Sequence, residues 1–211
     1  MRILAPAMTT QALFPTLVYT GRLGGRGWRA LNARLLRECR QLRADDAAGR
    51  RWSARNYPGG YTSYGSANRM HRLSPTFAAL ARAVDARVAS FARTLAFDLT
   101  GRTLAMTDCW VNIMGRGAAH GTHLHPLSTL SGTYYVATPP RSTIKFEDPR
   151  LERYMAAPPR LASAPRARRP WVLVAARTGA VVLFESWLRH EVPANEAAAE
   201  RVSISFNYNW F

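Results

Sequence analysis

Three histidines and one arginine are the residues whose types and spacing suggest chemistry. His123 and His125 are separated by one residue, and His190 follows about 65 residues later. In an extended segment, residues i and i+2 lie on one face, so both imidazoles could reach one ion as neutral nitrogen ligands. His190 is the only plausible third ligand on another strand, and three facial ligands would leave positions open for a cofactor, a substrate or oxygen. The alternative from spacing alone is that some of these histidines are hydrogen-bonded surface groups.

His120 competes for a place among these ligands. The spacing of His120 and His123 suits a helix better than a strand, and Gly121 between them disfavours a helix. We therefore expect His120 to lie in a loop or behind the ligands, and His123, His125 and His190 to hold the metal.

Arg201 begins a second pattern close to the C-terminus. Arg201, Ser203, Ser205 and Asn207 alternate with apolar residues, so they share one face of a predicted strand. Burying a row of polar side chains lowers stability unless they form hydrogen bonds with one another or with a ligand. A guanidinium group beside a hydroxyl group is suited to bind a carboxylate through two hydrogen bonds. The alternative is that Arg201 forms an internal salt bridge, with Asp148 or Glu185 as the candidate acids.

The first half of the chain supplies two predicted amphipathic helices. One spans about 28–42 and the other about 75–95, with Ser74-Pro75 as an N-cap followed by proline in the first turn. A short edge strand is predicted at 13–19, and residues 43–55 are polar and charged, which favours a loop.

The second half alternates with a period of two. Strands are predicted at about 104–113, 129–136, 143–146, 171–175, 180–184, 190–192 and 201–209, and Gly132 in the second of these allows a close approach. Residues 149–170 are rich in proline, alanine and arginine, so they are predicted to form a surface excursion. Many short strands separated by turn residues indicate a mainly β fold, an antiparallel sandwich or jelly roll, with the two helices packed outside.

The composition limits the partners. The 211 residues carry a net charge of +16, which invites a nucleic-acid role. However, Lys145 is the only lysine, and no RNA-binding aromatic motif or zinc-finger spacing accompanies the arginines. The arginines are scattered, with one local cluster at Arg160, Arg166, Arg168 and Arg169. We therefore expect no nucleic acid, while an acidic substrate or partner stays open, because net charge raises anion encounter rates without selecting a ligand.

Other features bear on the cellular setting. The sequence has no run of 18 or more apolar residues, so no transmembrane helix is expected. Cys39 and Cys109 are isolated cysteines, which favours a reducing, cytoplasmic environment over a disulfide scaffold. A homodimer is compatible with the sequence.

Four motifs in order resemble a family of 2-oxoglutarate- and Fe(II)-dependent oxygenases. They are His-Leu-His-Pro-Leu-Ser-Thr-Leu-Ser-Gly-Thr-Tyr-Tyr-Val at 123–136, Phe-Glu-Asp-Pro-Arg at 146–150, the segment from Gly179 through Leu-Phe-Glu-Ser-Trp-Leu to His190, and Arg-Val-Ser-Ile-Ser-Phe-Asn at 201–207. Trp110 and Asn112 also fit. The resemblance is strong over 104–209 and weaker around Gly59-Gly60-Tyr61.

This resemblance implies a double-stranded β-helix, a cupin-like jelly roll. We expect one oxygenase domain over 1–211, with 1–100 as a strand and helical support region and 101–211 as the jelly-roll core. The implied cofactors are Fe(II), 2-oxoglutarate and O2, and the implied reaction is hydroxylation of an unactivated C–H bond with release of succinate and CO2. The substrate would be a small molecule or a peptide.

The resemblance also implies roles for individual residues. His123 and His190 take the positions of iron ligands, and Arg201 with Ser203 takes the position that binds the far carboxylate of 2-oxoglutarate. Asn112 and Tyr135 are further candidates for cofactor contacts. His125 stands where related oxygenases have a carboxylate, so the third ligand is His125 itself or another group such as Asp148.

Two other functions are compatible with the residues. One is a three-histidine metal dioxygenase that does not use 2-oxoglutarate. The other is a non-catalytic module whose arginine-rich surface binds an acidic partner or nucleic acid.

Overall fold

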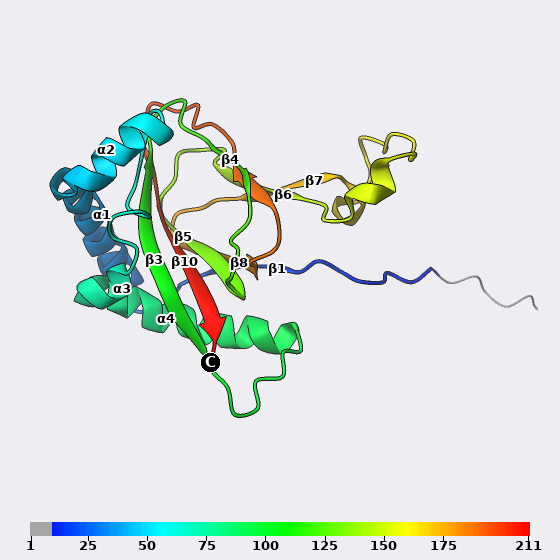
Figure 1. The fold of residues 1–211 in the computed structure, drawn as a ribbon, viewed down its shortest axis with the longest axis horizontal. Coiled ribbons are helices and arrows are strands. Elements are labelled where there is room, and N and C mark those ends of the chain that lie inside the picture. The colour runs from blue at the N-terminus through cyan, green and yellow to red at the C-terminus, as the bar shows by residue number, and fades with distance from the viewer. Residues whose placement is uncertain (1–9) are drawn as a thin grey trace, which may run out of the picture.

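Two antiparallel sheets form the body of the protein in the computed structural model, which describes residues 10–211 (Figure 1). The six-stranded sheet contains, in spatial order, β1 (Val18–Arg22), β8 (Ala180–Glu185), β5 (Leu130–Ala137), β10 (Arg201–Trp210), β3 (Leu104–Met114) and β2 (Gly60–Thr62). The four-stranded sheet contains β4 (His120–His123), β9 (His190–Val192), β6 (Thr143–Glu147) and β7 (Trp171–Ala175). This arrangement confirms the predicted mainly β jelly roll.

The alternation of side chains along β10 separates the two faces of the large sheet. Val202, Ile204 and Phe206 are buried in the main apolar core, which they share with the helices. Arg201, Ser203 and Ser205 point the other way and line a cavity between the sheets. The predicted polar row therefore faces the interior of the barrel.

The helices cover the outer face of the large sheet (Figure 1). They are α1 (Trp28–Asp45), α2 (Ala47–Asn56), α3 (Met70–Leu73) and α4 (Pro75–Thr94). The apolar stripes of α1 and α4 join the core of β3, β5 and β10, for example through Leu35 and Leu80, which are both fully buried. Ser74 caps α4 as predicted, since its Oγ accepts hydrogen bonds from the N–H groups of Thr76 and Phe77.

Gly132 shows why the central strands pack so closely. A Cβ at this position would lie 2.5 Å from a ring carbon of Phe206 and 2.7 Å from the carbonyl oxygen of Val182. Only a residue without a side chain fits there, so the predicted close approach is confirmed.

Two local predictions were wrong. Residues 43–55 are not a loop, because α1 continues to Asp45 and α2 begins at Ala47, with the Asp46 side chain accepting a hydrogen bond from the N–H of Gly49. Polarity suggested a loop, but alanine and arginine are good helix formers and Asp46 supplies the cap. The first strand is at 18–22 and not 13–19, because its only partner, β8, meets it from Val18 onward.

Residues 149–170 form the predicted excursion, which protrudes from the barrel between β6 and β7 (Figure 1). It contains only two short 3-10 helices, η1 (Leu151–Tyr154) and η2 (Arg166–Arg168). Cys39 and Cys109 are free and buried. None of the helices within 10–211 is long and apolar enough to cross a membrane.

Candidate metal centre

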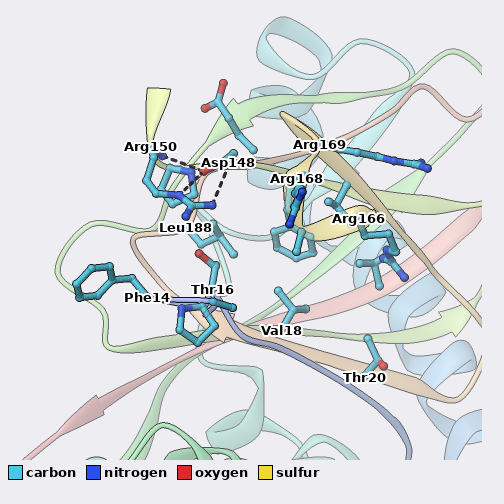
Figure 2. Close-up of a pocket in the computed structure, with 18 of the residues that line it drawn as sticks. Phe14, Thr16, Val18, Thr20, Asp148, Arg150, Arg166, Arg168, Arg169 and Leu188 are labelled. Atoms are coloured by element: carbon cyan, nitrogen blue, oxygen red, sulfur yellow. Dashed lines mark hydrogen bonds and ion pairs between the residues drawn. The ribbon is translucent and has the colours of Figure 1, made fainter. Parts of the chain in front are cut away.

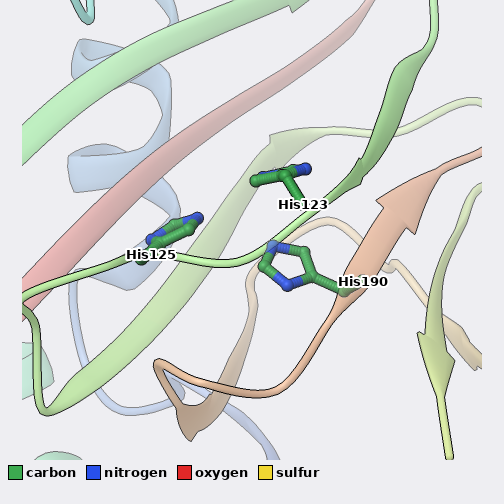
Figure 3. Close-up of side chains that lie close together, drawn as sticks. All are labelled: His123, His125 and His190. Atoms are coloured by element: carbon green, nitrogen blue, oxygen red, sulfur yellow. The ribbon is translucent and has the colours of Figure 1, made fainter. Parts of the chain in front are cut away.

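The predicted histidines come together at one end of the small sheet (Figure 3). His123 ends β4 and stands opposite His190, the first residue of β9, in the antiparallel register. His125 lies two residues beyond the end of β4. The backbone N–H of His125 instead donates to the carbonyl of Ser186, because strand pairing with β9 ends at His190.

The three rings converge on one point. One ring nitrogen from each of His123, His125 and His190 lies within 4.8 Å of the others. The ring centroid of His123 is 4.4 Å from that of His190 and 5.4 Å from that of His125, and His125 is 5.2 Å from His190. Among the described residues, this is the group of histidine, cysteine and acidic side chains that could hold a metal ion.

Hydrogen bonds select the same tautomer in all three rings. The Nδ1 atoms of His123 and His190 lie 2.7 and 2.9 Å from the carbonyl oxygens of Gly121 and Leu188. His125 Nδ1 lies 2.7 Å from Oδ1 of Asn207. Because these partners are acceptors, each Nδ1 carries the proton and each Nε2 keeps a free lone pair. A set of three neutral imidazole nitrogens is suited to divalent iron.

A buried polar network fixes the ring of His125. Asn207 Oδ1 also accepts from Ser131 Oγ at 2.9 Å, and the hydroxyls of Ser131 and Ser186 lie 2.7 Å apart. Asn207 is only 5% exposed, so water does not replace these contacts easily. The network therefore holds the His125 ring in place within the three-histidine group.

Burial keeps the rings of His125 and His190 in their neutral form. Desolvation, with the nearby His123 as the next cause, lowers the pKa of His190 to about 3. Desolvation also lowers the pKa of His125, although the hydrogen bond to Asn207 opposes this shift. Neutral imidazole is the form that binds a metal, so protons do not compete for the nitrogens of His125 and His190 near neutral pH.

Arg201 lies in the same cavity, a space of about 60 Å³ that the histidines also line. It is 4% exposed, its Nη1 contacts Met114 Sδ at 3.0 Å, and its Nε has no hydrogen-bond partner. No ion pair joins it to an acid of the described residues, so the alternative of a salt bridge to Asp148 or Glu185 was wrong. A buried guanidinium without a counter-ion fits an anionic ligand.

The other predicted cofactor residues surround Arg201. The guanidinium carbon lies 5.1 Å from the ring centroid of Tyr135, whose hydroxyl is buried and has no partner. Asn112 donates to Ser205 Oγ at 3.1 Å, while its own Oδ1 has no partner. Ser203 is 2% exposed and lines the cavity. The unpartnered polar atoms of Tyr135, Asn112 and the buried Arg201 indicate a place for a polar ligand.

His120 lines the cavity without joining the three-histidine group. It belongs to β4 and not to a loop, and its ring stacks on Tyr57 with centroids 4.3 Å apart. Burial lowers its pKa to about 3. This agrees with the expectation that His120 stands behind the ligands.

Sequence reasoning missed several residues around the cavity. Trp110 was noted only as part of the resemblance, yet it lines the cavity with its ring centroid 5.7 Å from that of His125. Ser186 was only a letter in a motif, yet its hydroxyl contacts that of Ser131 beside His125. No local signal identifies them, although the polar row that ends at Asn207 does point toward His125.

Asp148 is not part of the site. Its carboxylate pairs with Arg150 at 3.0 Å and with Arg153 at 2.7 Å, and it accepts a hydrogen bond from the hydroxyl of Tyr154. It lies outside the group of potential metal ligands. The suggestion that Asp148 replaces His125 as third ligand was therefore wrong for this conformation.

Comparison with known sequences supports the resemblance. Residues 108–207, just under half of the chain, match the family described as "Putative 2OG-Fe(II) oxygenase". The matched segment contains all three histidines, Arg201 and Ser203, and it ends at Asn207. The chain matches no curated protein sequence significantly.

Solved structures share the fold of the chain. A prolyl-4-hydroxylase from Pseudomonas putida has 16% identity and a TM-score of 0.57, with 92% of each chain covered. The epimerase SnoN, solved with Fe3+, alpha-ketoglutarate and nogalamycin RO, has 18% identity and a TM-score of 0.61, covering 92% of this chain and 78% of that one. HygX from Streptomyces hygroscopicus, solved with nickel and 2-oxoglutarate, has 15% identity and a TM-score of 0.59, covering 92% and 83%. At these identities the likeness establishes the double-stranded β-helix with its external helices.

Proposed function

We propose that this protein is a 2-oxoglutarate- and Fe(II)-dependent oxygenase that binds iron through His123, His125 and His190 and hydroxylates an unactivated C–H bond. The convergence of three neutral imidazoles beside a buried, unpaired arginine is the observation that supports these roles. When bound, Fe(II) and 2-oxoglutarate supply the oxidative chemistry, in which O2 is consumed and succinate and CO2 are released.

Each ligand residue has a defined part. The carbonyl groups of Gly121 and Leu188 hold the N–H of His123 and His190, so both rings present Nε2 to the cavity. Asn207 does the same for His125. Three neutral ligands in place of two histidines and a carboxylate leave the bound metal one charge more positive, which strengthens its attraction for the anionic cosubstrate.

Arg201 would orient 2-oxoglutarate by its far carboxylate. The guanidinium is held by the ring of Tyr135 and by Met114, and its Nε is free to donate. We assign Ser203, Tyr135 and Asn112 to the polar lining beside that carboxylate. Because Arg201 is only 4% exposed, little water would reach the charge pair, and this would make the pair stronger.

The expected substrate is a small molecule or a peptide. Trp110 and Tyr64 stack edge to face at 5.0 Å, and Tyr64 is 53% exposed, so this pair offers an aromatic surface outside the histidines. The two free, buried cysteines support our expectation of a reducing, cytoplasmic setting.

Replacement of Arg201 by methionine tests the cosubstrate site. We expect the affinity for 2-oxoglutarate to fall by about 2–4 kcal/mol, as for a desolvated, charge-paired contact, while metal affinity is unchanged. Arg43→Met is the matched control, because Arg43 pairs with Glu200 at the partly exposed surface. Isothermal titration under anaerobic conditions measures both ligands, and an unchanged 2-oxoglutarate affinity would remove Arg201 from the site.

Turnover separates this function from the two alternatives. Release of succinate coupled to O2 uptake is expected, and so is a weak visible absorption band with Fe(II) and 2-oxoglutarate under anaerobic conditions. A three-histidine dioxygenase without 2-oxoglutarate would consume O2 without succinate. A non-catalytic module would show neither metal dependence nor the band.

A further inference from the structure

A groove of about 1110 Å³ lies outside the histidine site (Figure 2). It runs between the N-terminal segment 10–16, strand β1, strand β7 and the end of the excursion. The groove and the histidine cavity have no lining residue in common. Phe146 lines the groove and lies 5.9 Å from His190, ring centroid to ring centroid.

Both long sides of this groove are the edges of sheets. β1 is the terminal strand of the large sheet, and β7 is the terminal strand of the small sheet. Val18 on β1 and Val172 and Val174 on β7 line the apolar floor between them. Free strand edges of this kind are templates for the addition of another strand.

The ladder between β6 and β7 shows which groups of β7 are free. The N–H of Asp148 donates to the carbonyl of Pro170, and the N–H of Ala176 donates to that of Ser142. In an antiparallel pair these bonds alternate, so Val172 and Val174 bond to β6, while Leu173 and Ala175 direct their N–H groups outward. Leu173 is 56% exposed.

Arg166 forms a hydrogen bond with the free edge of β7. Its Nη2 donates to the carbonyl oxygen of Leu173 at 2.9 Å, which occupies one outward acceptor of β7. The guanidinium thus stands where the backbone of an added strand would lie, and an acidic side chain on that strand would give it a stronger partner.

The walls of the groove carry unbalanced positive charge. The lining arginines are Arg22, Arg150, Arg153, Arg166, Arg168, Arg169 and Arg177, and the lining acids are Glu147 and Asp148. Asp148 pairs with Arg150 and Arg153, and Glu147 pairs with Arg189. The other five arginines have no ion pair with a described residue, and the sequence before residue 10 contains no acid.

We propose that this groove binds an extended acidic peptide segment of a partner protein, which adds to the edge of β7 as a further strand. Alternate apolar side chains of the segment would cover Val18, Val172 and Val174. The acidic side chains between them would meet Arg166, Arg168 and Arg177. The proposal concerns a surface outside the histidine cavity, so it does not depend on the reaction assigned there.

Other occupants fit the groove less well. A second copy of this chain would bring its own net charge of +16 to a basic surface. A nucleic acid would need several exposed aromatic rings for its bases, but Phe14 is the one exposed aromatic residue that lines the groove, Phe146 is only 4% exposed, and the floor is made of valines.

The test uses a fluorescein-labelled decapeptide of alternating glutamate and valine and measures anisotropy with the full chain. The variant Arg166→Glu/Arg168→Glu/Arg177→Glu should weaken binding about tenfold or more. The matched control is Arg34→Glu/Arg37→Glu/Arg40→Glu, which makes the same charge change at exposed positions of α1, across the barrel from the excursion (Figure 1). Binding of the control should stay within about twofold of the parent, because exposed charges beyond about 10 Å are screened.

A second variant tests the added strand itself. Leu173→Pro removes one outward N–H without removing a charge or a bond to β6, and proline is tolerated in edge strands. It should weaken peptide binding, and a glutamate–proline decapeptide, which lacks half of the N–H groups, should bind the parent poorly. Circular dichroism and urea unfolding verify that each variant is folded, and unchanged 2-oxoglutarate affinity verifies that the histidine site is intact.

Three results would overturn the proposal. Equal losses in the two triple variants would mean attraction by net charge alone. Full binding by Leu173→Pro would exclude strand addition at β7. Tighter binding of a ten-nucleotide oligothymidine than of the acidic peptide, lost in the groove variant, would assign the groove to nucleic acid.

Discussion

Asn207→Ala is the sharpest test of the proposal that His125 is the third metal ligand. Asn207 Oδ1 accepts from His125 Nδ1 at 2.7 Å and from Ser131 Oγ at 2.9 Å, and the side chain is 5% exposed. Without this acceptor the His125 ring is free to rotate or to exchange its proton to Nε2, which would remove the lone pair from the cavity. Loss of such an outer partner lowers metal affinity about 10–100-fold.

The same substitution should also destabilise the fold. His125 Nδ1 and Ser131 Oγ would both lose their acceptor, and each unsatisfied buried donor costs about 1–3 kcal/mol. The contact that remains between Ser131 and His125 reduces this cost. We expect a decrease of about 2 kcal/mol in the free energy of unfolding of the apo protein by urea titration.

Competition titration with Fe(II), Co(II) and a chromophoric chelator measures the metal affinity of each variant. Asn209→Ala is the matched control, because Asn209 lies two residues further along β10 and its Oδ1 accepts only from the N–H of Thr129, at 3.1 Å. Asn207→Asp keeps an acceptor oxygen and should restore the affinity. The reasoning is refuted if Asn207→Ala binds metal as tightly as the parent, or if Asn209→Ala loses as much.

Three further predictions concern the fold. Folding lowers the pKa of His190 from 6.5 to about 3, so between pH 6.5 and pH 3 the unfolded chain binds one proton more at this residue than the folded chain does. The free energy of unfolding of the apo protein should therefore be highest above pH 6.5 and should decrease as the pH falls toward 3. The slope is up to about 1.4 kcal/mol per pH unit, and urea titrations of His190→Gln should show a shallower slope. Gly132→Ala should lower the free energy of unfolding by about 1–3 kcal/mol through overpacking. Gly121→Ala, where a Cβ meets nothing within 4 Å, should lower it by less than about 1 kcal/mol. Equal losses in the two variants would contradict the role of close packing at Gly132. Ser74→Ala should lower the free energy of unfolding by about 1 kcal/mol, and no change would mean that the cap of α4 is unimportant.

The sequence by itself determined the local patterns. A period of two placed Arg201, Ser203, Ser205 and Asn207 on one face, since successive residues of a strand point to opposite sides. The apolar spacing of 28–42 and 75–95 gave the two long helices, and Ser74-Pro75 gave the start of the second. Where polarity was the only guide, at 43–55, the prediction failed, because polarity does not distinguish an exposed helix from a loop.

Only the tertiary structure decided which of these patterns meet. The register of β4 against β9 brings His190 opposite His123, and the pairing of β5 with β10 brings Asn207 opposite Ser131, beneath His125. The tertiary structure also leaves the Arg201 Nε without a hydrogen-bond partner and pairs Asp148 with both Arg150 and Arg153. Side-chain direction follows from local periodicity, but contacts between residues some 65–80 positions apart depend on strand order and register, which are set by packing of the whole core.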